Sequence, residues 1–163
     1  MTVTADRYLL ERALGDAIED RFPVKTNTTV YQGTMLTFVA ATGRVTDGAP
    51  ATTGSIAGAC VGFMNNSGSF LGSAITGNTA GTVYALVRWN HEAVFNVKTS
   101  ARTYTNLNRT VYVYQNDTVS GATGAGTTAL RIPAGRLCSF VDSTKAQAYI
   151  KLRASGDSAA TGA

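Results

Sequence analysis

The chain has 163 residues, of which 44% are hydrophobic and only 15% are charged. This length can build a hydrophobic core without a structural metal or a disulfide. The net charge of +4 excludes disorder driven by charge excess. No apolar run approaches the ~20 residues that span a bilayer. The first seven residues lack a basic stretch followed by an apolar one, so we expect no signal peptide.

Charge is distributed unevenly along the chain. Residues 1–21 hold three bases and five acids, whereas residues 22–163 hold eleven bases and five acids. The bases stand singly, and proteins that bind nucleic acids usually cluster them and interleave aromatic residues, so we expect no nucleic-acid partner. An acidic beginning and a basic remainder favour weak, salt-sensitive contacts between neighbouring molecules in an assembly.

The first predicted element is an amphipathic helix over residues 6–20. Its apolar residues recur at helical spacing, and they are Leu10, Ala13, Leu14, Ala17 and Ile18. Asp6 can cap the first turn, and Phe22-Pro23 ends the helix. A helix of this length is marginal alone and must dock, either on its own domain or on a neighbouring chain.

These patterns divide the chain into three parts. We expect an N-terminal helix or arm over residues 1–23, a β-rich domain over residues 24–153 and a flexible tail over residues 154–163. The apolar residues of the arm are candidate contacts to a partner, and they are Leu9, Leu10, Leu14, Ile18 and Phe22.

From residue 24 onward the apolar residues alternate with a period of two, which is typical of strands. The clearest strands are expected at 35–41, 57–64, 111–114, 137–141 and 146–152. Two alternating runs broken at Asn90-His91 predict a β-hairpin over residues 81–98. Turn signals such as Pro133-Ala134-Gly135 separate eight to ten short strands, and no internal repeat is evident. This pattern predicts a mainly β fold, a small antiparallel barrel or sandwich.

Residues that could carry chemistry are sparse. We expect His91, the single histidine, to be a solvated turn residue, and Cys60 and Cys138, which match no metal or redox spacing, to be buried thiols. The glycine-rich run 121–126 lacks the Lys-Ser/Thr ending of a phosphate-binding loop, and no nucleophile elbow is present. We therefore expect no enzyme activity, no cofactor and no metal site.

Three tyrosines fall on predicted polar strand faces, namely Tyr112, Tyr114 and Tyr149. Tyrosine is amphipathic and suits contacts between proteins, although tyrosine is also an ordinary strand residue. We add these three to the candidate contacts with a partner.

Several strand motifs follow one another in the second half of the chain. They are Gly81-Thr82-Val83, Glu92-Ala93-Val94-Phe95-Asn96-Val97, Arg109-Thr110-Val111-Tyr112-Val113-Tyr114, Asp117-Thr118-Val119, Ala134-Gly135-Arg136-Leu137 and Ala148-Tyr149-Ile150-Lys151-Leu152-Arg153, with Gly58-Ala59-Cys60-Val61-Gly62 earlier. This progression, over roughly residues 28–153, resembles the phage and prophage capsid decoration (cement) proteins of the DUF2190 type. Ala93 stands where that family usually has a glycine.

The resemblance implies a β-barrel-like domain without enzymatic activity that is often trimeric. It implies two partners, the major capsid protein and further copies of this chain, and no membrane. The expected location is the outer surface of an icosahedral capsid, after synthesis in the host cytoplasm. The alternatives are another phage structural part (head fibre, neck or tail), a carbohydrate-binding β-module that stacks sugars on Trp89 and the tyrosines, and a small hydrolase that depends on His91 or Glu92.

Overall fold

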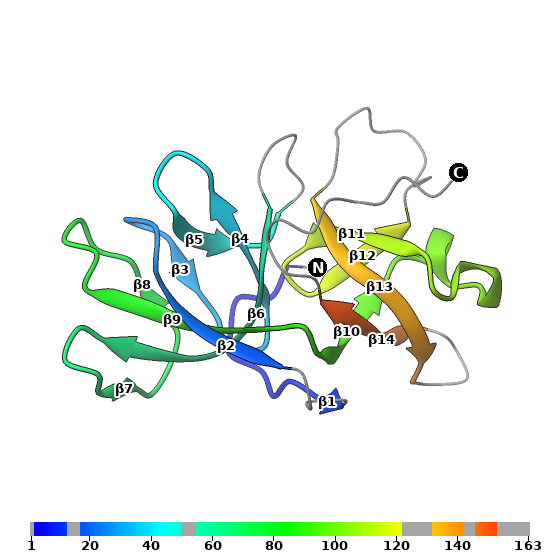
Figure 1. Cartoon of the computed structure of the whole chain (residues 1–163), viewed down its shortest axis with the longest axis horizontal. Helices are drawn as coiled ribbons and strands as arrows, with labels where there is room; N and C mark the ends of the chain where they lie inside the picture. The colour runs from blue at the N-terminus through cyan, green and yellow to red at the C-terminus, as the bar shows by residue number, and fades with distance from the viewer. Residues whose placement is uncertain (1, 13–16, 50–54, 122–131, 142–145, 153–163) are drawn as a thin grey trace.

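The computed structural model describes residues 2–12, 17–49, 55–121, 132–141 and 146–152. Their fold is mainly β, as the sequence predicts. Figure 1 shows two lobes side by side. The strands are β1 (Glu11–Arg12), β2 (Ile18–Pro23), β3 (Thr29–Val30), β4 (Met35–Val39), β5 (Arg44–Asp47), β6 (Ile56–Asn65), β7 (Phe70–Leu71), β8 (Ile75–Thr76), β9 (Val83–Trp89), β10 (Glu92–Val97), β11 (Thr110–Gln115), β12 (Thr118–Gly121), β13 (Pro133–Phe140) and β14 (Gln147–Leu152). Two short 3₁₀ helices, η2 (Thr99–Ala101) and η3 (Tyr104–Asn106), follow β10.

The second lobe is a closed five-stranded barrel, called barrel 2 here. Its strands pair in the ring order β10-β12-β11-β13-β14, and β14 pairs back onto β10. Every pairing is antiparallel except β10 with β12, which is parallel. Closing the ring leaves the five strands without a free long edge, so the lobe is protected from strand-to-strand aggregation.

The first lobe has the same topology and is called barrel 1. Its antiparallel sheet runs β2-β9-β6-β4-β5. A parallel bridge from Val24 to Val45 then joins the end of β2 to β5 and closes the ring. The parallel closure is the same in both barrels, because Lys25 N donates to Val45 O at 2.8 Å and Lys98 N donates to Val119 O at 2.9 Å. The chain therefore contains an internal structural repeat, contrary to the sequence interpretation.

The repeat extends to the strand register. Between β6 and β9 the pairs are Ala59–Arg88, Cys60–Val87, Gly62–Leu86 and Phe63–Ala85, and between β13 and β14 they are Arg136–Lys151, Leu137–Ile150, Ser139–Tyr149 and Phe140–Ala148. Both sets contain a register shift after their second pair, so even the β-bulge is repeated. Equivalent positions with the same residue include Glu19 and Glu92, Phe22 and Phe95, Val24 and Val97, Val45 and Val119, Gly58 and Gly135, and Phe63 and Phe140.

Each barrel encloses its own apolar core. Barrel 1 buries Val24, Val30, Leu36, Val45, Ala57, Cys60, Phe63, Ile75, Ala85 and Val87. The core of barrel 2 includes Phe95, Val97, Val111, Val113, Leu137 and Ile150, and it also takes in Leu9, Met35, Ile56 and Ala59 from outside that barrel. Burying each large aliphatic side chain contributes about 1.5–3 kcal/mol. The shared residues therefore join the two lobes through apolar contact.

The predicted helix over residues 6–20 is wrong, because the described part of this segment is extended. Residues 11–12 form β1 on β10, and residues 18–23 form β2 on β9. Ladder hydrogen bonds to two strands satisfy the backbone here, and this tertiary pairing outweighs local helix propensity. The predicted apolar face does not exist as a unit, since Leu9 is buried while Leu10 and Ile18 are 45% and 42% exposed.

The predicted hairpin over residues 81–98 is also wrong. Its two runs form β9 and β10, but β9 belongs to barrel 1 and β10 to barrel 2. The polar break at Asn90-His91 is the link between the barrels. The turn predicted at residues 133–135 is instead the start of β13. The strands expected at 35–41, 57–64, 111–114, 137–141 and 146–152 are confirmed as β4, β6, β11, β13 and β14 to within a few residues.

Candidate functional site

The segment of residues 2–12, called the strap here, runs along both barrels. On the side of barrel 1, Arg7 N donates to Gln32 O at 3.0 Å and Arg7 Nε donates to Gly33 O at 2.7 Å. Asp6 accepts from the backbone N–H of Gln32 at 2.7 Å and of Ala74 at 2.8 Å. Gly33, with φ of +79°, leaves room for this crossing, because a Cβ there would collide with the backbone of Arg7.

On the side of barrel 2 the strap continues as a strand. Val94 N donates to Leu10 O at 2.9 Å, and β1 pairs with the beginning of β10. Leu9 is 8% exposed and belongs to the core of barrel 2. Arg12 forms an ion pair with Glu92 and donates to Ser139 Oγ at 2.7 Å. The strap thereby fastens the two barrels to each other through backbone, apolar and charged contacts.

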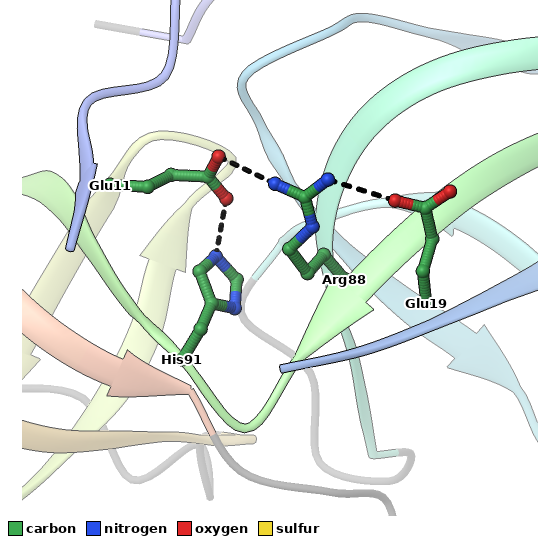
Figure 2. A network of polar contacts seen from close by, with 4 residues as sticks. All are labelled: Glu11, Glu19, Arg88 and His91. Carbon is green, nitrogen blue, oxygen red and sulfur yellow. Dashed lines mark hydrogen bonds and ion pairs between the residues drawn. The ribbon is translucent and has the colours of Figure 1, made fainter. Parts of the chain in front are cut away.

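A polar cluster lies where the strap meets the link between the barrels. This junction network consists of Glu11, Glu19, Arg88 and His91 (Figure 2). Arg88 bridges two carboxylates, with one nitrogen 2.7 Å from Glu11 Oε2 and another 2.9 Å from Glu19 Oε2. The imidazole Nε2 of His91 lies 2.7 Å from Glu11 Oε1. Three parts of the chain, the strap, barrel 1 and the link, therefore meet at one carboxylate.

His91 is completely buried, so the expectation of a solvated turn residue is wrong. Burial, together with the nearby Arg88 cation, lowers the pKa of His91 to about 4. Desolvation raises the pKa of Glu11, while Arg88 acts in the opposite direction. Glu11 therefore contacts a neutral imidazole on the link and the Arg88 cation on barrel 1, and these contacts hold the strap, the link and barrel 1 together.

A second polar cluster lies at the end of barrel 2 that faces barrel 1. The Asn116 side chain is buried, donates to Val3 O at 2.8 Å and to Asp47 Oδ2 at 2.7 Å, and accepts from Val3 N at 2.9 Å. Burial raises the pKa of Asp47 to about 6, partly offset by hydrogen bonds from Asn116 and Thr34. This cluster fixes the beginning of the strap against both lobes.

The structure separates the candidate contacts of the N-terminal segment. Leu9 lies inside the core, and Phe22 packs edge-on against Phe38 with ring centroids 4.8 Å apart. Leu10 and Ile18 are exposed. Leu14 lies outside the described residues, as does the predicted tail over residues 154–163.

The three candidate tyrosines are half-buried on the outside of barrel 2. Arg12 stacks on the Tyr149 ring with its guanidinium carbon 3.8 Å from the centroid, and Lys98 Nζ lies 4.0 Å from the centroid of Tyr114. Tyr112 lines a cavity of about 170 Å³ together with Ala101, Asn106, Arg109, Thr110, Val111 and Gly121. Two of the three rings therefore already have an intramolecular cation on one face.

The sequence reading missed the most exposed large apolar side chains. Tyr8 is 90% exposed on the strap, Phe70 is 75% exposed at the start of β7, and Tyr104 is 64% exposed on η3. Phe70 and Leu71 lie within a run of Gly and Ser over residues 67–73, and an aromatic residue in such a run is the sequence signal for its exposure. Tyr8 lies within the predicted helix over residues 6–20, where the sequence pattern gives no signal for its exposure.

The described residues offer few groups for reactive chemistry. No cluster of three or more His, Cys, Asp or Glu side chains suited to a metal ion occurs among them. Cys60 and Cys138 are free thiols; Cys60 is buried, as predicted, whereas the prediction that Cys138 is buried is wrong, since its side chain is half-buried near the end of β13. Desolvation raises the pKa of both, that of Cys60 to about 12, so neither is an activated nucleophile. In this part of the chain, no helix is long and apolar enough to cross a membrane.

Comparison of the chain with protein-family models, with curated proteins and with solved structures finds no match.

Proposed function

We propose that this protein is a structural virion component, a capsid decoration (cement) protein. It binds the outer surface of an assembled icosahedral shell and stabilises contacts between adjacent major capsid subunits. The observation that carries this proposal is the outward face of the strap. Tyr8 and Leu10 are 90% and 45% exposed. Leu9, between them, is buried in the core of barrel 2, and Glu11, which follows Leu10, is part of the junction network.

A fixed strand that displays apolar side chains is well suited to protein binding. Tyr and Leu side chains contribute most of their binding energy by leaving water, and tyrosine is enriched at interfaces. Because the strap backbone is already ordered, binding a partner costs little conformational entropy. The exposed Tyr8 and Leu10 thus offer a prepared contact.

The use of charged groups agrees with a structural role. Each of the seven carboxylates among the described residues has an intramolecular partner, and these residues are Asp6, Glu11, Glu19, Asp20, Asp47, Glu92 and Asp117. Pairs of carboxylates that perform acid–base catalysis need access to a substrate in a cleft. The resemblance of strands 81–97, 109–119 and 134–153 to cement proteins adds to this support.

Stabilisation of the shell would follow from mass action. A ligand that binds the assembled shell but not the separate subunits shifts the equilibrium toward assembly. Many copies on one lattice, and trimers in particular, add weak contacts through effective concentration. Individual interfaces can therefore be small.

The test is co-sedimentation of the purified full chain with empty shells of the virus whose structural genes accompany its own. We expect the wild type to sediment with shells at a fixed ratio and to raise their melting temperature. A Tyr8→Ser, Leu10→Ser variant should lose this binding, while the matched control Phe70→Ser, which removes an exposed aromatic elsewhere, should keep it. Wild type that stays in the supernatant, or that sediments with tails or necks instead, contradicts the proposal.

Deletion of the N-terminal segment is not a clean version of this experiment. Removing residues 1–22 would take away β1, most of β2 and the buried Leu9, so the remaining chain would lose part of barrel 1 and of the barrel 2 core. The two point substitutions leave these elements in place.

A further inference from the structure

Barrel 2 carries an exposed cross-strand row of polar side chains. Reading across the sheet, Thr110 on β11 pairs with Arg136 on β13, Arg136 pairs with Lys151 on β14, Lys151 pairs with Glu92 on β10, and Glu92 pairs with Arg12 on β1. Arg136 and Lys151 are both exposed, since Leu137, Ile150 and Leu152 take the inward positions. The row therefore lies on the outer face of the barrel, on the strands labelled β13 and β14 in Figure 1.

Two like charges stand directly opposite each other in this row. Arg136 and Lys151 are cross-strand partners, and like charges in that position destabilise a sheet. Arg136 donates to Asn108 Oδ1 at 3.2 Å, and this acceptor is a neutral amide oxygen. The one carboxylate of the row, Glu92, forms its ion pair with Arg12 and not with Lys151. Within the described part of the chain, no ion pair joins Arg136 or Lys151 to an acid.

A third cation borders the same surface. Arg109 is exposed just before β11, and its carbonyl accepts from Leu137 N at 3.0 Å, so its backbone lies against β13 one residue from Arg136. Arg109 also lines the cavity of about 170 Å³ with Asn106, Thr110 and Tyr112. Ligand pockets for drug-sized molecules are typically ~300–1,000 Å³, so this cavity suits a single side chain. We call Arg109, Arg136 and Lys151 the cationic face.

The equivalent row of barrel 1 has different chemistry. The residues that correspond to Thr110, Arg136, Lys151 and Glu92 are Met35, Ala59, Arg88 and Glu19. Met35 and Ala59 pack into the core of barrel 2, and Arg88 and Glu19 pair with each other. In barrel 1 this row is thus covered by its neighbour and internally neutralised. In barrel 2 the described residues leave it open and positively charged.

We propose that the cationic face of barrel 2 binds an acidic segment of a protein partner, with one carboxylate side chain seated in the cavity beside Arg109. This inference rests on the proposed function, in which the partner is the shell protein. Carboxylates match the charge of Arg136 and Lys151, and guanidinium groups bind them in a two-pronged geometry. The face supplies the charge complementarity and the strap supplies the apolar contact.

The contacts favour a protein partner over a nucleic acid. Binding of single strands needs aromatic rings on which bases stack. Of the three tyrosines on the outside of barrel 2, Tyr149 and Tyr114 already have a cation on one ring face, Arg12 and Lys98 respectively, which leaves Tyr112. Three described cations on adjacent strands also make a compact patch rather than a long basic groove.

The face itself is tested with a fluorescent ten-residue peptide rich in Glu and Asp, titrated with the full chain at low and at physiological salt. We expect measurable affinity that falls as salt rises, and an Arg136→Glu, Lys151→Glu variant should lose at least about tenfold. The control is Lys25→Glu, which also reverses the charge of an exposed lysine but lies in barrel 1, away from the cationic face. It should change affinity less than twofold. Thermal unfolding verifies that all variants fold.

Three results would overturn the assignment of the face. They are no peptide binding by wild type, an equal loss in Lys25→Glu, and tighter binding of a thymidine oligonucleotide than of the peptide with the same sensitivity to Arg136→Glu, Lys151→Glu. The last result would make the surface a nucleic-acid site.

Shell co-sedimentation separates this inference from the proposed function. If wild type fails to sediment with shells, the proposed function fails, while the peptide data still decide whether the face binds acidic segments. If wild type sediments and the Arg136→Glu, Lys151→Glu variant does so equally well, the shell role of the face is overturned and the proposed function stands. Loss of sedimentation in that variant alone supports both.

Discussion

Gly58 and Gly135 occupy the same place in the two barrels, each pressed against the carbonyl oxygen of the neighbouring strand. A Cβ at Gly58 would collide with Arg88 O, and a Cβ at Gly135 would collide with Lys151 O. Arg88 and Lys151 are themselves equivalent in register. The repeat therefore preserves a steric requirement as well as a strand order.

Replacing either glycine by alanine should destabilise the protein. We expect Gly58→Ala and Gly135→Ala each to cost about 2 kcal/mol or more, because the colliding atom is backbone and the strands must separate. Gly72→Ala is the matched control, since nothing lies near a Cβ there. Urea denaturation measures the free energy of unfolding. A neutral effect at both Gly58 and Gly135 would show that the two strands are less closely packed than described.

Two neighbouring leucines of the strap should differ sharply in their effect on stability. Leu9 is 8% exposed within the barrel 2 core, so Leu9→Ala should cost about 2–4 kcal/mol. Leu10 is 45% exposed, and Leu10→Ala should change the free energy of unfolding by less than about 0.5 kcal/mol. Thermal or urea unfolding of the two variants side by side provides the measurement. Equal losses would mean that the strap is not held as a strand.

Arg88 should contribute more to stability than its outer partner Glu19. Arg88→Met leaves Glu11 half-buried without its cation, which should cost about 2–3 kcal/mol. Glu19 is 44% exposed, so Glu19→Gln should cost less than about 1 kcal/mol. Chemical denaturation compares them. If the Arg88→Met, Glu11→Gln double variant recovered none of the loss, the carboxylate would not be the cause.

The buried His91 and the half-buried Asp47 should give stability an opposing dependence on pH. Burial lowers the pKa of His91 to about 4 in the folded protein, so the unfolded chain binds the proton at a higher pH than the folded chain does. The stability that the neutral imidazole contributes is therefore complete above pH ~6.5 and is lost as the pH falls toward 4. Burial raises the pKa of Asp47 to about 6, so its burial penalty is complete above that pH and is relieved as the pH falls toward 3.8.

Two variants separate these effects through urea midpoints at pH 7.5 and pH 5. His91→Gln should lose less stability on acidification than wild type, by about 2 kcal/mol at pH 5. Asp47→Asn should lose more, because the compensating relief is gone. Parallel behaviour of His91→Gln and wild type would place the acid sensitivity elsewhere.

The fold class was predictable because alternation reports which side of a strand is buried. Ala148, Ile150 and Leu152 point inward on β14 just as their spacing predicts. Alternation does not report which strand lies alongside. Two alternating runs with a short polar break fit a hairpin and a link between barrels equally well, so the sequence does not reveal that β9 and β10 belong to different barrels. The fully buried state of His91 follows from that link and could not be read from a lone residue in a polar break.

The repeat and the strap depended on contacts that are distant in sequence. The two barrels have the same residue type only at scattered equivalent positions, such as Phe22 and Phe95. Loops of different length separate these positions, so no continuous segment of sequence recurs. The apolar residues at 10, 14 and 18 fit a helical period by spacing alone. Only the pairing of the segment with β9 and β10 decides for extended backbone.

The strap also sets an order in which the molecule can be completed during synthesis. Val3 bonds a residue 113 positions later, and Arg12 bonds one 127 positions later. This segment leaves the ribosome before the strands of barrel 2, yet its binding site there exists only after Asn116 and Ser139 have also emerged. Loop closures this long slow folding. Until barrel 2 forms, the apolar residues of barrel 1 that pack against it, Met35, Ile56 and Ala59, stay exposed to water. Chaperone dependence and yield on overexpression should therefore respond to strap substitutions such as Leu9→Ala more than to changes in the barrel loops.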